Sequence, residues 1–557
     1  MLARDVKVPL NLKQALNDPT WAKQWREAVH TELQNMVNAE VWEIIPIPSE
    51  GVDNFVDTKF VFRAKPSDTG GIEKFKARLV ARGFTQVHGI DYTETFAPVI
   101  RGATFRMQCC DCVKKGLKAK QIDFEAAFLQ SPVDNDIYLR LDKSAGVDVP
   151  EGYCIKLKKG LYGTKQAAFL WNGALVRLLL SEGFRRSVAD PMLFIREDSN
   201  GYFTITAWVD DCCVCFSDEA AFKALYEKLN GVYPIGEVKD LVWHLGMRVS
   251  MTESYIEISL DRYIDDTLAR FSSIMDTVRK GKHATPMRSE HASKPLCKAD
   301  MPKNDSERLD PTVCPYRKLL GCLMFIAMWG RPDIATAVSL CARFQDNPGK
   351  RHWQALCHIL AYLRQTQHKC IRYSNNAHQN DDHVAYVDAD FANSDVDGLK
   401  SRTGYVFFWC GGPIVWRSTL QSLVAQSSCE SELIALNACG KEAEWVRVLH
   451  AELTSGLFDH TESGVVPIME DNTGAKALAE NYYTSKRSRH FRVRLFHIRQ
   501  QIRDGVCRVE YINTNDNVAD LFTKPLQAQK FLPFRDSLVV DPLSKPSSLG
   551  ETKRAAQ

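Results

Sequence analysis

The sequence lacks a hydrophobic run long enough to cross a membrane. Its longest apolar stretch, residues 319–330, has about 12 residues, whereas a transmembrane helix needs about 20. This stretch therefore favours a buried core helix. No signal peptide or other targeting segment is evident either. We expect an intracellular protein, in a cytoplasmic particle or in the nucleus, with no membrane partner.

The sequence also has little excess charge. A net charge of only +3 gives no bulk signal for nucleic acid, so such a signal has to lie in the arrangement of charges. No Walker-type glycine loop is present. Among the 17 cysteines, Cys109/Cys112 and Cys212/Cys215 have metal-like spacing. Because no His or Cys lies at zinc-finger distance from these pairs in their apolar runs, we predict buried, reduced thiols.

What is present is an ordinary globular composition over the length of several domains. Hydrophobic residues make up 45% and charged residues 25% of the 557 residues, and about 150 residues per domain gives three or four domains. Periodicity and turn signals predict an α+β chain. We expect an N-terminal helical segment, a mixed helix and strand region, a linker with a helical connection, a second α/β region and a tail that is disordered at its end, at residues 1–40, 41–275, 276–380, 381–527 and 528–557.

Two adjacent acids, Asp210 and Asp211, lie between two apolar strands in residues 204–216. They could simply form a solvated turn, because Asp is common in turns. A third acid, Asp123, follows a short apolar stretch at the start of an Ala-rich helix. Acids that bridge two metal ions suit phosphoryl transfer, and magnesium prefers oxygen ligands. These three acids are therefore candidate ligands for Mg²⁺, with Mn²⁺ as the alternative ion.

A row of cations lies upstream, in residues 74–84. As a strand, this segment would place Lys74, Lys76, Arg78 and Arg82 on one face, since alternate residues of a strand point the same way. A row of cations suits a triphosphate. The alternative is a solvated strand face.

Together these segments resemble the reverse transcriptase of copia-type retrotransposons. Several motifs in the same order are far more specific than any one of them, and the resemblance covers roughly residues 10–530. The motifs are Lys76–Gln86, Asp91–Val99, Gln121–Leu129, Leu161–Gln166, Trp208–Asp211 and His244–Met247.

The resemblance implies a right-hand polymerase with fingers, palm and thumb, in which Asp123, Asp210 and Asp211 are the catalytic metal ligands. It also implies residues that bind the incoming deoxynucleotide. Lys76 and Arg78 would hold its phosphates, Phe128 would crowd the sugar 2′ position, and Gln166 would contact the nucleotide.

Some positions depart from the family. Trp208 stands where Tyr is usual, Ala168-Phe169 where Pro-Arg is usual, and Phe60 where Trp is common. We expect these changes to affect rate and fidelity more than reaction class. They also favour the alternative of a decayed or domesticated relic that binds nucleic acid without catalysis.

A second set of acids lies at strand ends and helix starts, within residues 386–391, 427–436, 466–472 and 511–525. Four converging carboxylates around two metals could activate water against a phosphodiester, although four unrelated surface acids would give the same pattern. The joint pattern resembles the ribonuclease H region that follows the polymerase in the same family. By that match the metal ligands would be Asp388, Glu432, Asp471 and Asp520.

Rival acids lie next to two of these positions, Asp390 beside Asp388 and Glu430 beside Glu432. The Leu-Ile-Ala-Leu run after Glu432 matches the helix face of the family and favours Glu432. A basic stretch, residues 485–494, could track a phosphate backbone or be a solvated loop. His490 lies in it and His497 follows it, and Arg492 replaces the Asp that the family usually carries.

The sequence therefore predicts an RNA-directed DNA polymerase joined to a ribonuclease H. Its partners would be an RNA template, a DNA or RNA primer, deoxynucleotides and an RNA–DNA hybrid. Because nothing resembles the family's protease and integrase segments, we expect a fragment of a larger polyprotein.

Overall fold

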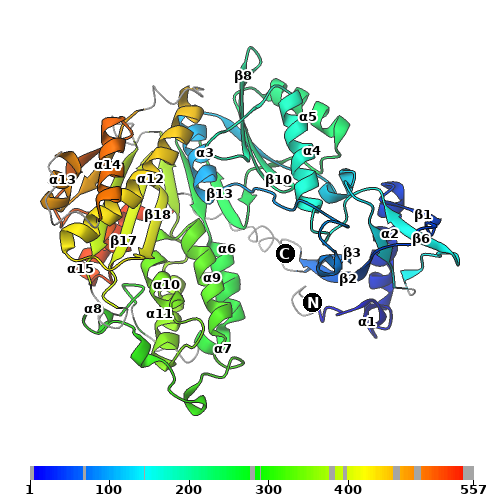
Figure 1. Ribbon diagram of the computed structural model, residues 1–557, viewed down its shortest axis with the longest axis horizontal. Coiled ribbons are helices and arrows are strands. Elements are labelled where there is room, and N and C mark those ends of the chain that lie inside the picture. Colours follow the sequence, from blue (N-terminus) through cyan, green and yellow to red (C-terminus); the bar gives the residue numbers. More distant parts are fainter. Residues whose placement is uncertain are drawn as a thin grey trace, which may run out of the picture.

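The computed structural model describes residues 6–66, 71–142, 145–275, 281, 283–288, 290–375, 383–392, 398–455, 464–481 and 491–543. These residues form a mixed α/β molecule with four β-sheets. Figure 1 shows the first sheet at one end of the molecule and the last at the other. In the described part of the chain, none of the helices combines the length and apolar character that crossing a membrane requires.

The N-terminal segment, which the sequence predicts to be helical, forms two helices. The Asp18 carboxylate accepts hydrogen bonds from the backbone N–H groups of Thr20 and Trp21 and makes a turn between the helices. Trp25 of the second helix is fully buried and packs its ring against Phe62. The helices thereby share a core with the first sheet, whose strand order is β1-β6-β5-β2-β3. The bounds are α1 Leu12–Leu16, α2 Ala22–Asn38, β1 Trp42–Pro46, β2 Phe55–Pro66, β3 Ile72–Ala81, β5 Tyr138–Arg140 and β6 Tyr153–Leu157.

The second sheet has the order β11-β4-β10-β9-β8-β7, and its neighbouring strands are antiparallel. Cysteines of α3 and β10 are buried in its core as free thiols, which confirms the prediction for Cys109, Cys112, Cys212 and Cys215. The bounds are α3 Gly102–Lys114, β4 Lys118–Asp123, η3 Ala127–Gln130, α4 Ala167–Ser181, β7 Arg185–Arg186, β8 Leu193–Asp198, β9 Gly201–Trp208, β10 Asp211–Phe216, α5 Glu219–Val232 and β11 Lys239–Asp240.

A third sheet, ordered β12-β13-β14-β15, joins two distant parts of the chain, because β14 pairs with β15 more than a hundred residues later. The intervening residues form the helices at the bottom of Figure 1. The bounds are β12 Trp243–His244, β13 Met247–Met251, β14 Tyr255–Ser259, α6 Asp261–Arg270, α7 Ser272–Met275, α8 Glu290–Ser293, α9 Tyr316–Trp329, α10 Ala335–Ala342, α11 Lys350–Thr366 and β15 Ile371–Ser374.

The fourth sheet is mixed. Its order is β18-β17-β16-β19-β20, with β19 parallel to both of its neighbours. The expected tail from residue 528 begins instead with a helix, α15, whose Phe531, Phe534 and Leu538 are buried; residues 544–557 lie outside the described residues. The bounds are β16 Val384–Asp390, β17 Arg402–Trp409, β18 Gly412–Leu420, α12 Ser428–Ser455, β19 Val466–Glu470, α13 Thr473–Glu480, α14 Arg492–Arg503, β20 Cys507–Tyr511, η11 Val518–Phe522 and α15 Ala528–Leu538.

Helix α3 lies between the second and fourth sheets. Its Arg106 is buried, donates from Nε to the Ile414 carbonyl of β18 at 2.8 Å, and stacks over the Trp416 ring at 4.1 Å. A buried guanidinium keeps its charge only when its donors are satisfied. The hydrogen bond to β18 therefore helps to fix the C-terminal sheet against the second sheet.

Candidate catalytic centres

The first acidic centre is built on two neighbouring strands and the turn of a hairpin. Asp123 ends β4, Asp211 begins β10, and the two residues are direct cross-strand partners. Asp210 occupies the two-residue turn between β9 and β10, where its carbonyl accepts from the Phe124 N–H at 3.1 Å. The register therefore brings together all three acids that the sequence singled out.

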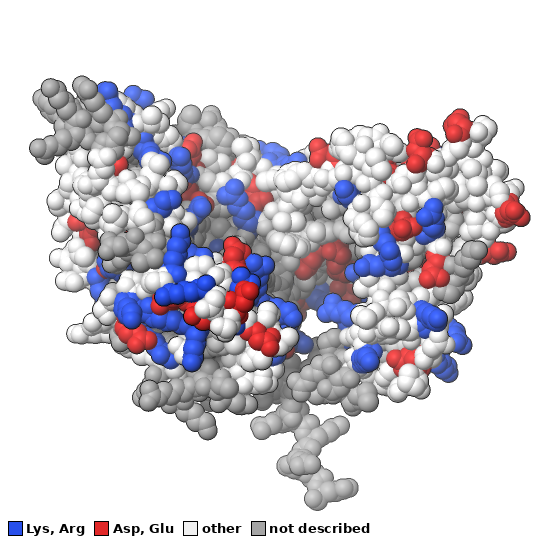
Figure 2. Space-filling model, turned by 60° about the horizontal axis from the view of Figure 1, so that its bottom comes forward, with Lys and Arg blue, Asp and Glu red and all other residues white. Residues whose placement is uncertain are grey.

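Burial and repulsion between neighbouring carboxylates raise the pKa values of two of these acids. Burial, reinforced by the charges of Asp210 and Asp211, raises the pKa of Asp123 to about 6. Burial and the Asp211 charge also raise the pKa of Asp210. Figure 2 shows acidic side chains gathered in the hollow between the two lobes, with Lys and Arg side chains beside them. Such a site favours a cation that can neutralise several carboxylates at once.

The cationic strand faces this centre. The charges of Lys76 and Arg78 lower the pKa of Asp210, which opposes the effect of burial. Arg78 also stacks over the Tyr162 ring at 4.7 Å, and the rings of Tyr162 and Phe128 lie 5.5 Å apart. The cations and Phe128 therefore line the same site as the carboxylates. Tyr162 was not predicted as a site residue, although it lies inside the Leu161–Gln166 motif.

Two further residues expected at this centre are placed differently from Lys76, Arg78 and Phe128. Strand β3 ends at Ala81, so Arg82 lies beyond the face that carries Lys76 and Arg78. Gln166 is fully buried, and its side-chain amide donates to the Asp91 carbonyl and accepts from Gln86. Its polar atoms are bonded within the protein, so a nucleotide contact would have to replace one of these hydrogen bonds.

Two polar neighbours of Asp211 were missed as site residues. Gln121 of β4 donates from Nε2 to Asp211 Oδ1 at 2.8 Å. His244 of β12 is buried, and its Nδ1 lies 3.5 Å from the same oxygen. Both residues lie inside motifs that carry the family resemblance, Gln121–Leu129 and His244–Met247. Only the strand register, which the sequence does not show, brings them to the carboxylate.

The second acidic centre is more compact. Asp388 of β16, Glu432 of α12 and Asp471, which follows β19, each place a carboxylate oxygen within 4.8 Å of the other two. In the described residues no other group of three or more potential metal ligands is this close, including the three acids of the first centre. The structure therefore brings together three of the four acids expected for the nuclease.

A buried glutamate, Glu470, belongs to this centre and was missed. It is fully buried at the end of β19, and its Oε1 accepts from the Asn472 N–H at 2.9 Å. Burial raises the pKa of Glu470 well above its usual value, and the charges of Asp471 and Asp388 add to this rise. The pKa of Glu432 is also raised, mainly by burial and next by the charge of Glu470.

Asp520 lies next to the trio but is held by lysines. It forms ion pairs with Lys524, at 2.6 Å, and with Lys530. These cations outweigh burial and lower the pKa of Asp520, whereas burial raises the pKa of Asp388 to about 7. A metal ion at Asp520 would have to compete with both ammonium groups, and Asp520 is not among the three clustered acids.

The rival acids occupy other places. The Glu430 carboxylate accepts from the Gln426 N–H at 2.7 Å and caps the start of α12, and Asp390 is the last residue of β16, two residues beyond Asp388. His497 of α14 lies within 3.0 Å of the Asn437 amide, and Arg492 lies at the exposed start of α14. His490 and most of the basic stretch lie outside the described residues.

The second centre fits a divalent metal ion by its own chemistry. Its donors are carboxylate oxygens, which hard cations prefer. Among the described residues, the buried Oε2 atoms of Glu432 and Glu470 have no hydrogen-bond donor. Buried carboxylate oxygens without donors are costly unless a cation pairs with them. The arrangement therefore suits one or two divalent ions.

Residues 39–287 match the family described as reverse transcriptase (RNA-dependent DNA polymerase). The chain is 31% identical over 541 residues to the retrovirus-related Pol polyprotein from transposon TNT 1-94 of Nicotiana tabacum, which covers 95% of this chain and 39% of that protein. It is 32% identical over 537 residues to the Pol polyprotein from transposon RE1 of Arabidopsis thaliana, which covers 96% of this chain and 34% of that protein.

A solved foamy viral protease-reverse transcriptase in complex with double-stranded DNA aligns with 95% of this chain and 75% of its own, at 13% identity. Its TM-score of 0.25 is too low for a comparison of domain arrangement. The chain spans less than half the length of the two transposon Pol polyproteins. The resemblance inferred from the ordered motifs is confirmed: residues 39–287 form a domain of the reverse transcriptase (RNA-dependent DNA polymerase) family, and the chain is related over most of its length to the Pol polyproteins of copia-type transposons.

Proposed function

We propose that the chain is an RNA-directed DNA polymerase with a ribonuclease H, taken from a copia-type Pol polyprotein. It extends the 3′ hydroxyl of a DNA or RNA primer along an RNA template with deoxynucleotides and cuts the RNA of the resulting hybrid. The observation that carries the polymerase is the register that pairs Asp123 with Asp211 and puts Asp210 in the adjoining turn.

In this proposal the first sheet forms the fingers, the second the palm, and the third sheet with helices α6 to α11 the thumb and connection. The carboxylates of Asp123, Asp210 and Asp211 hold the magnesium ions, with manganese as the alternative. Bound metal would supply charge neutralisation at the attacking and leaving oxygens. Lys76 and Arg78 orient the triphosphate from the facing strand, and Phe128 limits the space at the sugar.

The nuclease is supported by the closeness of Asp388, Glu432 and Asp471. These three residues would hold the metal ions there. Glu470, which directly precedes Asp471, would add negative charge to the centre. Asp520, held by its lysines, orients Asp388 and the 523–525 segment. The hybrid is recognised by its backbone and shape, not by its base sequence.

Primer extension tests the polymerase. Purified protein receives a primed RNA template, deoxynucleotides and magnesium. We expect extension in the wild type and none in Asp210→Asn. Asp240→Asn is the matched control, because Asp240 lies on β11 of the same sheet and is exposed in an ion pair with Lys120. A wild-type protein that binds the primed template without extending it would support the relic and refute the polymerase.

Hybrid cleavage tests the nuclease separately. We expect the wild type to cut the RNA strand of a labelled RNA–DNA hybrid and Asp471→Asn to leave it intact. Asp504→Asn, an exposed change at the end of α14, is the control. Cleavage that persists in Asp471→Asn would refute the nuclease site, whatever the result of the extension assay.

A further inference from the structure

The end of helix α9 lies against the strand that leads into the first acidic centre. Trp329 is the last residue of α9, and Trp208 is the last residue of β9. Their ring centroids are 5.8 Å apart and their ring planes are inclined at 70°, an edge-to-face arrangement that aromatic pairs favour. Trp329 lies outside residues 39–287, the part of the chain that matches the reverse transcriptase family. A segment beyond that domain therefore reaches the hairpin of the first centre.

Trp208 lies directly beside the carboxylates of this centre. It is the cross-strand partner of Asp211, which is in turn the partner of Asp123 on β4. Directly opposite residues of an antiparallel pair point to the same face of the sheet, so these three side chains share a face. Along the chain, only Val209 and Asp210 separate Trp208 from Asp211. A shift of the Trp208 ring would therefore move a two-residue turn and the acids next to it.

Two side chains from other parts of the molecule anchor the end of α9. Arg106 of α3 donates from Nη1 to the carbonyls of Met328 and Trp329, each at 3.3 Å. Trp416 of β18 donates from Nε1 to the Ala327 carbonyl at 2.9 Å. The last carbonyls of a helix have no partner within the helix, and a cation suits this negative end of its dipole. The end of α9 is therefore fixed to α3 on one side and to the fourth sheet on the other.

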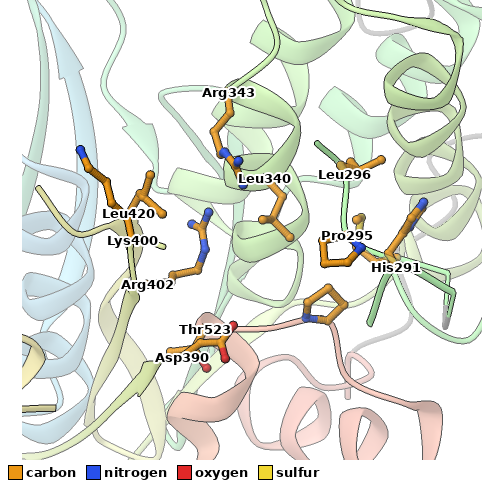
Figure 3. A pocket seen from close by; sticks show the side chains of 12 residues that line it. His291, Pro295, Leu296, Leu340, Arg343, Asp390, Lys400, Arg402, Leu420 and Thr523 are labelled. Carbon is orange, nitrogen blue, oxygen red and sulfur yellow. The ribbon is translucent and has the colours of Figure 1, made fainter. Parts of the chain in front are cut away.

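Helix α10, which follows α9, is tied to the same sheet. Its Ser339 donates from Oγ to the Ser418 carbonyl at 3.0 Å and accepts from Arg402 Nη1 at 2.8 Å. Figure 3 shows Arg402 pointing toward the end of this helix, where Leu340 lies. The helical connection therefore offers Trp208 a support that is itself held in place.

We propose that Trp329 is a positioning residue for the first acidic centre, whose ring supports Trp208 and thereby fixes the hairpin that carries Asp210 and Asp211. The proposal rests on the polymerase part of the proposed function. It gives the helical connection a role in polymerisation, although the connection lies outside the matched domain. It also gives a role to the departure at position 208, since the indole of Trp208 offers Trp329 a larger surface than the usual Tyr ring.

Trp329→Leu removes the aromatic contact and keeps an apolar side chain. We expect kcat for primer extension by the full chain to fall about tenfold, which corresponds to about 1.4 kcal/mol in the barrier. The KM for deoxynucleotides and the affinity for the primed template should stay at their wild-type values, because the cations of β3 are unchanged. Trp329→Phe, which keeps a ring, should restore most of the rate. Rapid-quench extension and fluorescence anisotropy measure these quantities.

Trp353→Leu is the matched control. Trp353 is half-buried on α11 of the same connection, and its ring packs against Tyr316 at 6.4 Å. This variant should lose stability and keep kcat. Gly102→Ala gives a second reading if Trp329→Leu does not fold. A Cβ atom at Gly102 would lie 3.3 Å from the Trp329 ring, so the added methyl should displace the ring and lower kcat in the same direction.

A double variant tests whether Trp329 acts through Trp208. If it does, Trp208→Leu combined with Trp329→Leu should lose no more kcat than the slower of the two single variants, because residues in contact couple. Losses that multiply would show that the two tryptophans act independently and would overturn the proposal.

Hydrogen exchange of the hairpin, residues 204–216, tests positioning without catalysis. We expect faster amide exchange in Trp329→Leu and no change in Trp353→Leu, because a hairpin that has lost its support opens more often. Exchange equal to that of the wild type would overturn the proposal, whatever happens to kcat. A wild-type protein that extends no primer would refute the proposed polymerase, and exchange alone would then decide whether Trp329 positions the hairpin.

Discussion

Asp210 owes its position to an unfavourable turn. Val209, the first turn residue, has a φ of +61°, where β-branched residues are rarely found. Such backbone costs about 1–3 kcal/mol and persists only when neighbours hold it in place. Here the buried Trp171 donates from Nε1 to the Val209 carbonyl at 2.7 Å. Trp171 is therefore a positioning residue for the carboxylate beside it.

Trp171→Phe should keep most of the packing and remove this hydrogen bond. We expect a loss of about 1–3 kcal/mol in stability and a lower kcat for primer extension with little change in KM for deoxynucleotides. Stopped-flow extension and urea unfolding measure the two effects. Trp353→Phe, the same change on α11, should leave kcat unaltered. A kcat equal to wild type in a destabilised Trp171→Phe protein would mean that the bond serves stability alone.

Asp111 should make stability depend on pH. It is buried on α3, pairs with Lys115 and accepts from the Tyr202 hydroxyl. Burial nevertheless raises its pKa to about 6 from 3.8. The folded state therefore holds this proton more tightly than the unfolded state, and stability falls as pH rises through the interval between those two values.

Asp111→Asn should remove that dependence. The free energy of unfolding of the wild type, relative to the variant, should fall by up to about 3 kcal/mol between pH 4 and pH 6. Urea titrations of both proteins at several pH values give this difference, in which all other titrating groups cancel. A difference that stays constant with pH would show that Asp111 titrates as it does in the unfolded chain.

At the scale of elements, repulsion between the acids of the second centre is concentrated where β16, α12 and β19 converge. Glu432→Gln should relieve it. Without metal at pH 8, we expect the variant to be more stable than the wild type, and the difference to shrink at low pH, where the wild-type acid is protonated. Magnesium should stabilise the wild type, by about 2.7 kcal/mol at 100 times its dissociation constant, and the variant much less. Thermal unfolding with and without metal measures both effects.

The exposed Glu444→Gln on the same helix is the control and should change neither quantity. A Glu432→Gln protein that is less stable than the wild type at pH 8 would contradict the stored repulsion. A magnesium response equal to that of the wild type would exclude Glu432 as a ligand.

The sequence predicts the elements better than their contacts. Acids at strand ends, such as Asp123 and Asp388, could be found because apolar runs mark the strands. Glu470 also ends a strand, but its burial depends on α12 packing above it, which the sequence does not show. For Gln166 the motif indicates a nucleotide contact, but the sequence does not show that its amide accepts from Gln86, 80 residues away.

At the scale of the whole molecule, helix α12 links the two proposed centres. It carries Glu432 near its start and Glu452 near its end, about 30 Å away at 1.5 Å per residue. Glu452 is fully buried and accepts from the Ser187 hydroxyl at 2.5 Å and from the Val188 N–H at 2.8 Å, in the loop before β8. Trp445 of the same helix donates to the Ala189 carbonyl at 2.8 Å. The second sheet therefore holds this helix, and with it the second acidic centre, at a fixed distance from the first.

Glu452→Ala should loosen that spacing and leave each centre intact. Both donors of the loop would lose their buried acceptor, at a cost of about 1–3 kcal/mol each. During extension the wild type should cut RNA at one narrow distance behind the primer end, because a rigid connection fixes the length of hybrid between the centres. In Glu452→Ala the cuts should spread over several nucleotides, while extension and cleavage measured separately keep their rates. Gel analysis of end-labelled RNA gives the distribution, and Glu444→Ala should keep it narrow. Cuts as narrow in Glu452→Ala as in the wild type would show that the hybrid itself, and not α12, sets the distance.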